Sequence, residues 1–386
     1  MFQLRLNVIA RSNNSAVTIR CVKRINFVRG DASKATTQDP HKQSSDVWAS
    51  EHLQHILQHF DAPIRFAAGY GSGVLKQDGY GLNPNVKPPM VDLIFGVTHP
   101  EHWHSLNLRQ NPSHYSFVSA LGAKSVTALQ EKWGASMYFN PDVQIGEQRI
   151  KYGVISMKHL IQDLNEWNNF YVAGRFQKPI RILRGDSRVK LSNDENLANA
   201  VRVALLILPP QFSEYQLYTT IVGLSYLGDF RMIFGENPKK VENIVNAQVG
   251  YLRVLYKPVL KDLCEHFVAG IESVSAGEEV QALDAHKVVF SQNMDVKLRG
   301  ALLFELPKKV RDKVLAVFHK KSRMDTVVSA LDLSQKAAAS DSIQSMVKQA
   351  IAETVRGPAL TQSIKGLITA GPTKSFRYIG EKLSKR

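Results

Sequence analysis

The chain has 386 residues, of which 44% are hydrophobic and 22% are charged, a composition typical of a globular protein long enough for two domains. Its two cysteines, Cys21 and Cys264, lie far apart, which excludes a disulfide framework and a cysteine zinc site. The longest uninterrupted apolar run, Val203 to Leu208, has six residues. A membrane-spanning helix needs about 20, so no spanning segment is expected.

The net charge of +15 is concentrated at the two ends of the chain. Residues 1–30 contain six basic residues and no acidic one, and residues 356–386 contain seven basic residues and one acidic one. The body between them therefore has a net charge of only about +3. A near-neutral body argues against a broad nucleic-acid-binding face, so no nucleic acid is expected as a partner.

The N-terminal stretch is basic and free of acids, with scattered Ser, Asn and Thr, which predicts a transit peptide. The alternative is a basic tail without a targeting role. We assign residues 1–35 to targeting and linker, with polar linker sequence continuing to residue 46. A helix is then expected over residues 47–60, because apolar residues recur there with helical spacing.

The most informative stretch runs from Gly69 to Val97. A predicted strand over residues 64–68 leads into a glycine-serine loop, and a second apolar strand, predicted over residues 90–95, carries Asp92. Glycines allow a backbone to approach phosphates closely, and a carboxylate in a buried strand is costly unless it is paired or holds a cation. The stretch therefore indicates a site for a metal-bound nucleoside triphosphate. The alternative is a glycine-rich hairpin with one satisfied aspartate.

Two other regions offer polar side chains for a site. Four histidines fall within residues 99–114, but their spacing matches no zinc pattern, so solvated histidines or polar contacts to a substrate are expected. Further on, Arg175 and Lys178 are three residues apart in a predicted turn, so both could reach one phosphate group. A solvated basic turn is the alternative.

The second half of the chain is predicted to be mostly helical. A strand over residues 151–156 and a helix to Trp167 complete the first part, and we place the domain boundary near residues 184–186. A capping box formed by Ser192 and Glu195 is expected to open a helix over residues 194–208. The further expected helices cover residues 213–227 and 238–256 and much of residues 275–345.

The C-terminal segment, residues 356–386, is basic and amphipathic and can lie in an anionic membrane surface. The alternative is a terminal helix docked on the core. The expected membrane-contacting residues form two groups separated by Gly371 and Pro372, with Lys365 placed among the surrounding basic residues. These contact residues are Ile364, Leu367, Ile368, Lys374, Phe376, Arg377, Ile379, Lys382 and Leu383.

Six blocks follow one another in the chain: GYGSGV (69–74), VDLIFGV (91–97), NPSHYS (111–116), IKYGVIS (150–156), DLNEWNNFYVAGRFQKP (163–179) and SYLGDFRM (225–232). With these blocks the chain resembles the mitochondrial phosphatidate cytidylyltransferases, also called the translocator assembly and maintenance proteins. The resemblance covers roughly residues 45–260 and the C-terminal segment. The first two blocks also resemble the signature of polymerase-β-type nucleotidyltransferases, a Gly-Ser turn before a strand with Asp-x-Asp. Ile94 replaces the second acid here.

The resemblance implies an α+β fold in three parts. These are a polymerase-β-type nucleotidyltransferase domain at residues 45–185, a mostly helical, winged-helix-like domain at 186–345, and the membrane-binding segment at 356–386. It also implies transfer of CMP from CTP to phosphatidic acid with Mg²⁺, giving CDP-diacylglycerol and pyrophosphate for cardiolipin synthesis. The expected location is peripheral, on the matrix side of the mitochondrial inner membrane. The sequence leaves the oligomeric state open.

The resemblance also implies roles for individual residues. Asp92 is the expected principal metal ligand, and Ser72 and Lys178 are the other expected catalytic residues. Asp163 and Asp229 are candidates for a second metal-binding carboxylate, because each lies in one of the blocks. The expected contacts to CTP or the lipid headgroup are Tyr70, Gly71, Ser72, Gly73, Asn107, His114, Tyr115, Arg175 and Lys178.

Two other functions compete with this hypothesis. One is a nucleotidyltransferase that acts on RNA or protein, which the near-neutral body disfavours. The other is a non-catalytic matrix factor that supports the protein-import translocase, which the missing second acid at Ile94 favours.

Overall fold

The computed structural model describes residues 53–75, 89–234, 237–264, 268–270, 282–322 and 329–383. The expected transit peptide and linker lie outside these residues, as does the start of the helix expected over residues 47–60. Of that helix, residues 53–58 are described and are helical. All described residues fall in one compact unit, which spans Ser44–Arg386.

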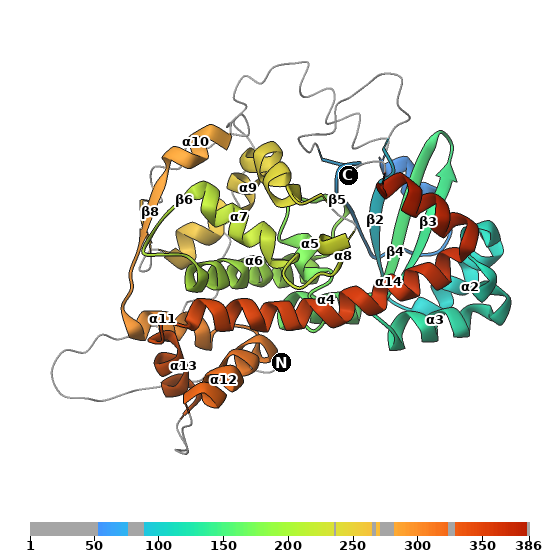
Figure 1. Cartoon of the computed structure of the whole chain (residues 1–386). Coiled ribbons are helices and arrows are strands. Elements are labelled where there is room, and N and C mark those ends of the chain that lie inside the picture. Colours follow the sequence, from blue (N-terminus) through green and yellow to red (C-terminus); the bar gives the residue numbers. More distant parts are fainter. Residues whose placement is uncertain are drawn as a thin grey trace. The chain divides into compact units, whose positions relative to one another are not determined.

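A five-stranded mixed sheet forms the first half of the described chain (Figure 1). Its strand order is β3-β4-β2-β1-β5, and β2 and β4 are parallel while the other neighbours are antiparallel. The strands are β1 (Phe66–Tyr70), β2 (Val91–Val97), β3 (Met137–Ile145), β4 (Gln148–Ser156) and β5 (Arg181–Arg184). The two strands expected around the glycine loop are therefore neighbours in the sheet, at its centre.

Side-chain alternation gives the two faces of this sheet different partners. One face carries Leu93, Phe95 and Tyr152 and packs against the helix at residues 53–58 and against α2 (Pro100–Gln110). The opposite face carries Phe66 and Ile94 and packs against three helices. These helices are α4 (Met157–Glu166), α5 (Ala173–Phe176) and α6 (Ser187–Ile207). Between α2 and β3 lie η1 (Pro112–His114), η2 (Phe117–Leu121) and α3 (Gly122–Lys132).

Helix α6 begins earlier than the sequence predicted. Its N-cap is Asp186, whose carboxylate accepts a hydrogen bond from the Arg188 backbone N–H, and the helix runs unbroken through Ser192. The capping box expected at Ser192 and Glu195 was therefore wrong, because an aspartate six residues upstream already caps the helix. A capping box does occur at the start of α7 (Glu214–Leu224), between Ser213 and Gln216.

The rest of the second half is helical with one small sheet. Strands β6 (Gln211–Ser213), β8 (Val289–Gln292) and β7 (Val268–Ala269) form a three-stranded antiparallel sheet in the order β6-β8-β7. The remaining helices before the C-terminal one are α8 (Arg231–Phe234), α9 (Lys240–Cys264), α10 (Ala282–Lys287), α11 (Val296–Phe304), α12 (Lys308–Ser322) and α13 (Ala330–Ala338).

The last helix, α14 (Ile343–Leu383), is continuous through Gly371 and Pro372. It contacts α12 and α6 and also β3, so this helix packs against the first half of the chain as well as the second (Figure 1). The side chains of Ile368 and of residues 370–383 lie outside the description, and with them most of the expected membrane contacts. None of the helices in the described ranges is long and apolar enough to cross a bilayer.

Candidate active site

In the glycine turn between β1 and β2, two positions require glycine, each for a different physical reason. Gly71 has a φ of +79°, a conformation that side chains disfavour, and its carbonyl accepts hydrogen bonds from the N–H groups of Val74 and Leu75. Gly73 packs directly against the start of β2, where an added Cβ would lie 2.3 Å from the Met90 carbonyl oxygen. Ser72 is exposed at the tip of this turn. The result is a tight turn with Ser72 at its exposed tip.

Tyr70, Asp92 and Lys151 form a row across three neighbouring strands on one face of the sheet. Tyr70 is paired in register with Asp92, and Asp92 with Lys151. The Lys151 Nζ lies 3.7 Å from the Asp92 Oδ1, and the Asp92 side chain retains 27% exposure. A Cβ added to Gly71 would lie 3.6 Å from the Asp92 Oδ2. The carboxylate therefore faces both the glycine turn and a cation.

The same face continues from this row into the hydrophobic core. Ile94, two residues beyond Asp92, is fully buried there. A carboxylate at that position would have to be desolvated among apolar side chains. The strand thus supplies one acid to the site.

Arg175 brings a second cation to this row from α5. Its guanidinium carbon lies 5.6 Å from the centre of the Tyr70 ring and 3.7 Å from the centre of the Tyr171 ring, and Nη1 donates to the Tyr171 carbonyl. Burial, with the negative charge of Asp92, raises the pKa of Tyr70 to about 12. Tyr70 is therefore a neutral hydroxyl at physiological pH, and the charges nearby belong to Asp92, Lys151 and Arg175.

Lys178 lies beside Arg175 but faces the helical half of the chain. Its ammonium donates to the Gly174 carbonyl and, at 2.8 Å, to the Ser225 hydroxyl. It also lies 5.3 Å from the centre of the Tyr226 ring, which Lys240 approaches to 5.9 Å. Burial and the positive charges of Arg175 and Lys240 hold the pKa of Lys178 well below its usual value. A bound anion would relieve this repulsion.

Asp229, a candidate second metal ligand, is paired with Arg231. The Arg231 Nε lies 3.0 and 3.1 Å from the two carboxylate oxygens of Asp229, and the backbone N–H of Arg231 donates to one of them. Burial raises the pKa of Asp229, but the hydrogen bonds and charge of Arg231 outweigh that effect and lower it overall. Asp229 thus holds an arginine near Arg175, an arrangement that favours a supporting role over metal ligation.

Asp163, the other candidate, accepts four backbone hydrogen bonds. The N–H groups of Asn169 and Phe170 donate to one carboxylate oxygen, and those of Val172 and Ala173 to the other, at 2.8–3.1 Å. These bonds fill the acceptor positions of the carboxylate. Asp163 therefore organises the loop that leads into α5 and so positions Arg175, and the arrangement disfavours it as a metal ligand.

Three predicted substrate contacts lie on the opposite face of the sheet from Asp92. Asn107 donates to the hydroxyls of Tyr115 and Tyr152 at 3.0 and 2.9 Å, and the His114 Nδ1 lies 2.9 Å from the Tyr152 hydroxyl. All these side chains are buried. The site that the structure assembles around Asp92 does not include them, because Tyr152 follows Lys151 in β4 and neighbouring residues of a strand point to opposite faces.

Three cations near the site, Lys151, Arg231 and Lys240, are not among the site residues expected from the sequence. Lys151 lies in the block IKYGVIS, where alternation places it on the face opposite Tyr152. Its proximity to Asp92 depends on the parallel pairing of β2 with β4, two strands separated by more than fifty residues. No local signal in the sequence reveals that register.

The residues present fit a magnesium ion that the substrate helps to hold. Mg²⁺ is commonly bound by one or two carboxylates together with waters and substrate phosphates. Asp92 offers a partly exposed carboxylate beside the glycine turn. Among the described residues no three His, Cys, Asp or Glu side chains gather into a ready-made metal cage.

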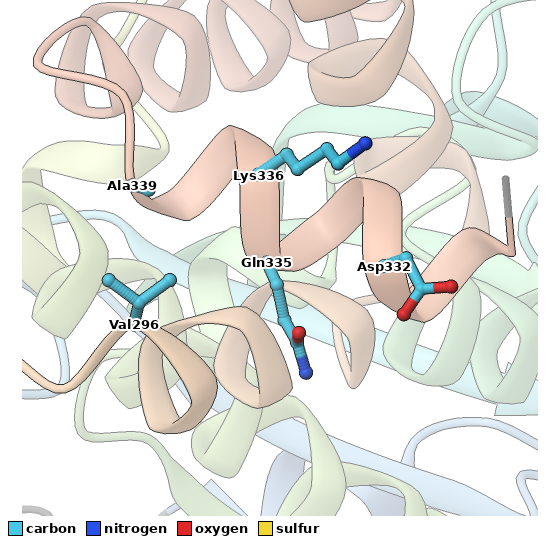
Figure 2. A pocket seen from close by; sticks show the side chains of 5 residues that line it. All are labelled: Val296, Asp332, Gln335, Lys336 and Ala339. Carbon is cyan, nitrogen blue, oxygen red and sulfur yellow. The ribbon is translucent and has the colours of Figure 1, made fainter. Parts of the chain in front are cut away.

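A separate hollow lies between α11 and α13, far along the chain from these residues (Figure 2). It is lined by Val296, Asp332, Gln335, Lys336 and Ala339. Asp332 already accepts a hydrogen bond at 2.6 Å from Ser329, the N-cap of α13. This hollow contains none of the residues described above and is not part of the candidate site.

One carboxylate, a glycine turn and several cations on one side of a sheet are suited to a phosphate-rich substrate with a metal ion. Comparison with known proteins identifies an enzyme of the nucleotidyltransferase class. The family model for mitochondrial phosphatidate cytidylyltransferase matches residues 53–385. The chain belongs to this family.

Curated relatives support the same assignment. The chain is 41% identical to the mitochondrial phosphatidate cytidylyltransferase of Schizosaccharomyces pombe over 340 residues, which cover 87% of this chain and 83% of that protein. It is 39% identical to the Xenopus laevis protein of the same name, covering 86% of this chain and 94% of the relative. The Mus musculus protein is 38% identical, with the same coverage.

Proposed function

We propose that this chain transfers CMP from CTP to phosphatidic acid at the site formed by the glycine turn, Asp92, Lys151 and Arg175. The observation that carries the proposal is the in-register row of Tyr70, Asp92 and Lys151 beside the Gly71 turn. This row occurs in a chain whose family and relatives are named for that activity.

In this reaction a phosphate oxygen of phosphatidic acid attacks the α-phosphorus of CTP. A new P–O bond forms, the bond to the β-phosphate breaks, and pyrophosphate leaves. A phosphate monoester has a second pKa near 6 and is mostly dianionic at neutral pH, so no strong general base is needed. The difficulty is that two anions must meet, and catalysis depends on positioning and charge neutralisation.

The residues of the site divide this task. The Gly71–Gly73 turn would hold the β- and γ-phosphates of CTP through its backbone, with Ser72 at its tip. Lys151 and Arg175 would neutralise the phosphates that gather beside Asp92. Lys178, with Ser225 and Lys240, offers a further basic group for the incoming headgroup. Asp92 would hold a Mg²⁺ ion, which would neutralise charge on the transferred phosphoryl group when bound.

The finer description of the fold also belongs to this proposal. The pair β1 and β2, joined by the glycine turn and carrying Asp92, supports a polymerase-β-type nucleotidyltransferase unit. The small sheet β6-β8-β7, with α7, α9 and α10 around it, supports a winged-helix-like unit. The proposed location is peripheral on the matrix side of the mitochondrial inner membrane, where the product would serve cardiolipin synthesis.

Purified full-length protein should form CDP-diacylglycerol from CTP and phosphatidic acid in a reaction that requires Mg²⁺ and releases one pyrophosphate for each product. Labelling of RNA or protein acceptors instead would favour the competing nucleotidyltransferase function. Absence of any CTP turnover in a folded preparation that supports protein import would favour the non-catalytic function. Either result would overturn the proposal.

A further inference from the structure

Helix α5, which carries Arg175 and leads directly into Lys178, is a single turn of four residues. A helix this short is not stable by itself, so contacts from other elements must hold it. The side chains of both cations donate to nearby carbonyls and to the Ser225 hydroxyl, and no carboxylate within the described ranges forms an ion pair with either of them. The position of Arg175 and Lys178 relative to Asp92 therefore depends on what holds the turn.

The loop before α5 has an unfavourable backbone conformation. Trp167 and Phe170 have φ angles of +51° and +53°, in the left-handed region that side chains disfavour. Both residues are buried, and their ring centroids lie 4.6 Å apart. Such strain persists only where the surrounding structure enforces it, and it is concentrated at functional sites. The contacts that hold this loop are therefore candidates for a role in the site that follows it.

Asn196, on α6, supplies contacts at both ends of α5. Its Oδ1 accepts hydrogen bonds from the Trp167 Nε1 at 2.9 Å and from the Nε2 of Gln177, the C-cap of α5, at 3.1 Å. Its Nδ2 donates to the carbonyl of Ala173, the first residue of α5, at 3.1 Å and to the Asn193 Oδ1 at 3.0 Å. The Asn196 amide is fully buried and uses both of its donor hydrogens and both acceptor positions.

Tyr256, on α9, binds the end of the same turn from the helical half of the chain. Its hydroxyl donates to the Gln177 carbonyl at 2.8 Å, and its side chain is fully buried. The turn is also packed closely against the end of α7, because a Cβ added to Gly174 would lie 2.6 Å from the Ser225 Cβ. Elements on both sides of α5 therefore fix where it lies.

We propose that Asn196 and Tyr256 are positioning residues for the two cations of this turn. Asn196 fixes both ends of α5, and Tyr256 ties its C-cap to α9. Together they hold Arg175 and Lys178 within reach of phosphates bound beside Asp92. We call this pair the α5 clamp. The inference rests on the proposed function, in which the two cations bind phosphates, and it makes their placement depend on how α9 packs against the first half of the chain.

Binding of pyrophosphate in the presence of Mg²⁺, measured by calorimetry on the full chain, tests the clamp. Tyr256→Phe removes one hydroxyl and keeps the buried ring, so the fold should survive. Its Kd for pyrophosphate should rise at least about fivefold, because Arg175 and Lys178 would no longer be held in one place. Asn196→Ala removes four hydrogen bonds and should raise the Kd further in preparations that remain folded.

Tyr218→Phe is the matched control. Tyr218 is also fully buried, and its ring centroid lies 6.1 Å from that of Tyr256. Its hydroxyl donates to the Glu214 Oε1 at 3.0 Å and does not contact α5. A hydrogen bond to a carboxylate is stronger than one to a carbonyl, so Tyr218→Phe should lower the Tm at least as much as Tyr256→Phe. It should leave the Kd for pyrophosphate within twofold of wild type.

A double-mutant cycle shows whether Tyr256 acts through the cations. In a Lys178→Met background, Tyr256→Phe should raise the Kd for pyrophosphate by less than about twofold, because one of the groups that it positions is already gone. A Kd for Tyr256→Phe within twofold of wild type would overturn the proposal. An equal loss of binding in Tyr218→Phe, or fully additive effects in the cycle, would show that these bonds serve stability only and would also overturn it.

An assay of CMP transfer on the same preparations separates the clamp from the proposed function. If wild type and Tyr256→Phe bind pyrophosphate as expected but no phosphatidate receives CMP, the proposed function fails and the clamp stands. If wild type transfers CMP and Tyr256→Phe keeps both its kcat/KM and its pyrophosphate affinity within twofold of wild type, the proposed function stands and the clamp fails.

Discussion

The two faces of the five-stranded sheet both carry polar side chains, but only one of them carries charge. Under α2, Asn107 and Tyr152 are buried and satisfy their hydrogen bonds within a neutral network. On the other face, Asp92 and Lys151 are partly exposed next to the glycine turn, and Arg175 lies beside them. Neutral groups can be buried at modest cost if they are hydrogen-bonded, whereas charges are costly without partners. Accessible charge, more than polarity, therefore marks the candidate site.

The sharpest test of this difference is Asp92→Asn. The change keeps the volume of the side chain and removes the charge proposed to hold Mg²⁺, so CMP transfer should fall at least about 1,000-fold, roughly 4 kcal/mol in barrier, with little change in thermal stability. Asp142→Asn is the control, because Asp142 lies in β3 and pairs with Arg149 away from the row. Activity of Asp92→Asn within threefold of wild type would remove Asp92 from the metal role.

The glycine turn gives a second test on the charged face. Gly71→Val should raise the KM for CTP by about 10- to 100-fold, since a side chain would strain a backbone with φ of +79° and enter the space beside Asp92. Gly146→Val is a matched control, because Gly146 also has a positive φ but lies in the β3–β4 turn with open space around it. Unchanged CTP binding by calorimetry in folded Gly71→Val would make the turn structural only.

Removing one phenol hydroxyl from each face compares the two directly. Tyr152→Phe removes the hydrogen bonds that the Tyr152 hydroxyl makes with the buried Asn107 and His114, so the free energy of unfolding should fall by about 1–3 kcal/mol while the KM for CTP stays the same. Tyr70→Phe should do the reverse, with a several-fold effect on turnover and little on stability. A raised KM for CTP in Tyr152→Phe would show that the site extends to the face under α2. The two faces would then not differ in function as proposed.

Lys365 lies between these two cases, because it is buried like the neutral groups under α2 but can carry a charge like the residues around Asp92. Burial lowers its pKa to about 7, whereas an unfolded lysine titrates near 10.5. Between these values the unfolded chain binds more protons than the folded chain, so this residue makes stability rise with pH from about 7 toward 10. Urea unfolding at several pH values should show a smaller rise for Lys365→Met than for wild type.

Lys132→Met is the control for that measurement, because Lys132 is exposed at the end of the same helix that Lys365 contacts. It should leave the pH dependence as in wild type. An identical slope for Lys365→Met and wild type would show that Lys365 keeps an ordinary pKa in the folded chain.

The sequence alone determined the local features whose cause is local. The apolar runs on either side of the glycine-serine loop predicted the two strands around the Gly71 turn and the aspartate on the second of them. The run of blocks predicted the family, which the comparisons confirm. The mixture of helices with a mixed sheet is also confirmed, whereas the finer fold description, the domain limits near residue 185 and the roles of the individual site residues stay predictions.

The tertiary structure decided which polar residues lie close together. Lys151 reaches Asp92 only through the parallel pairing of β2 with β4. Asn107 lies on the opposite face of the sheet from Asp92, because it is hydrogen-bonded to Tyr152, which points to that face. Lys365 appeared basic and solvated in the sequence, but it binds the carbonyls of a helix more than 230 residues earlier. Strand register and helix rotation are set by contacts between distant segments, and a single sequence does not encode them in its local pattern.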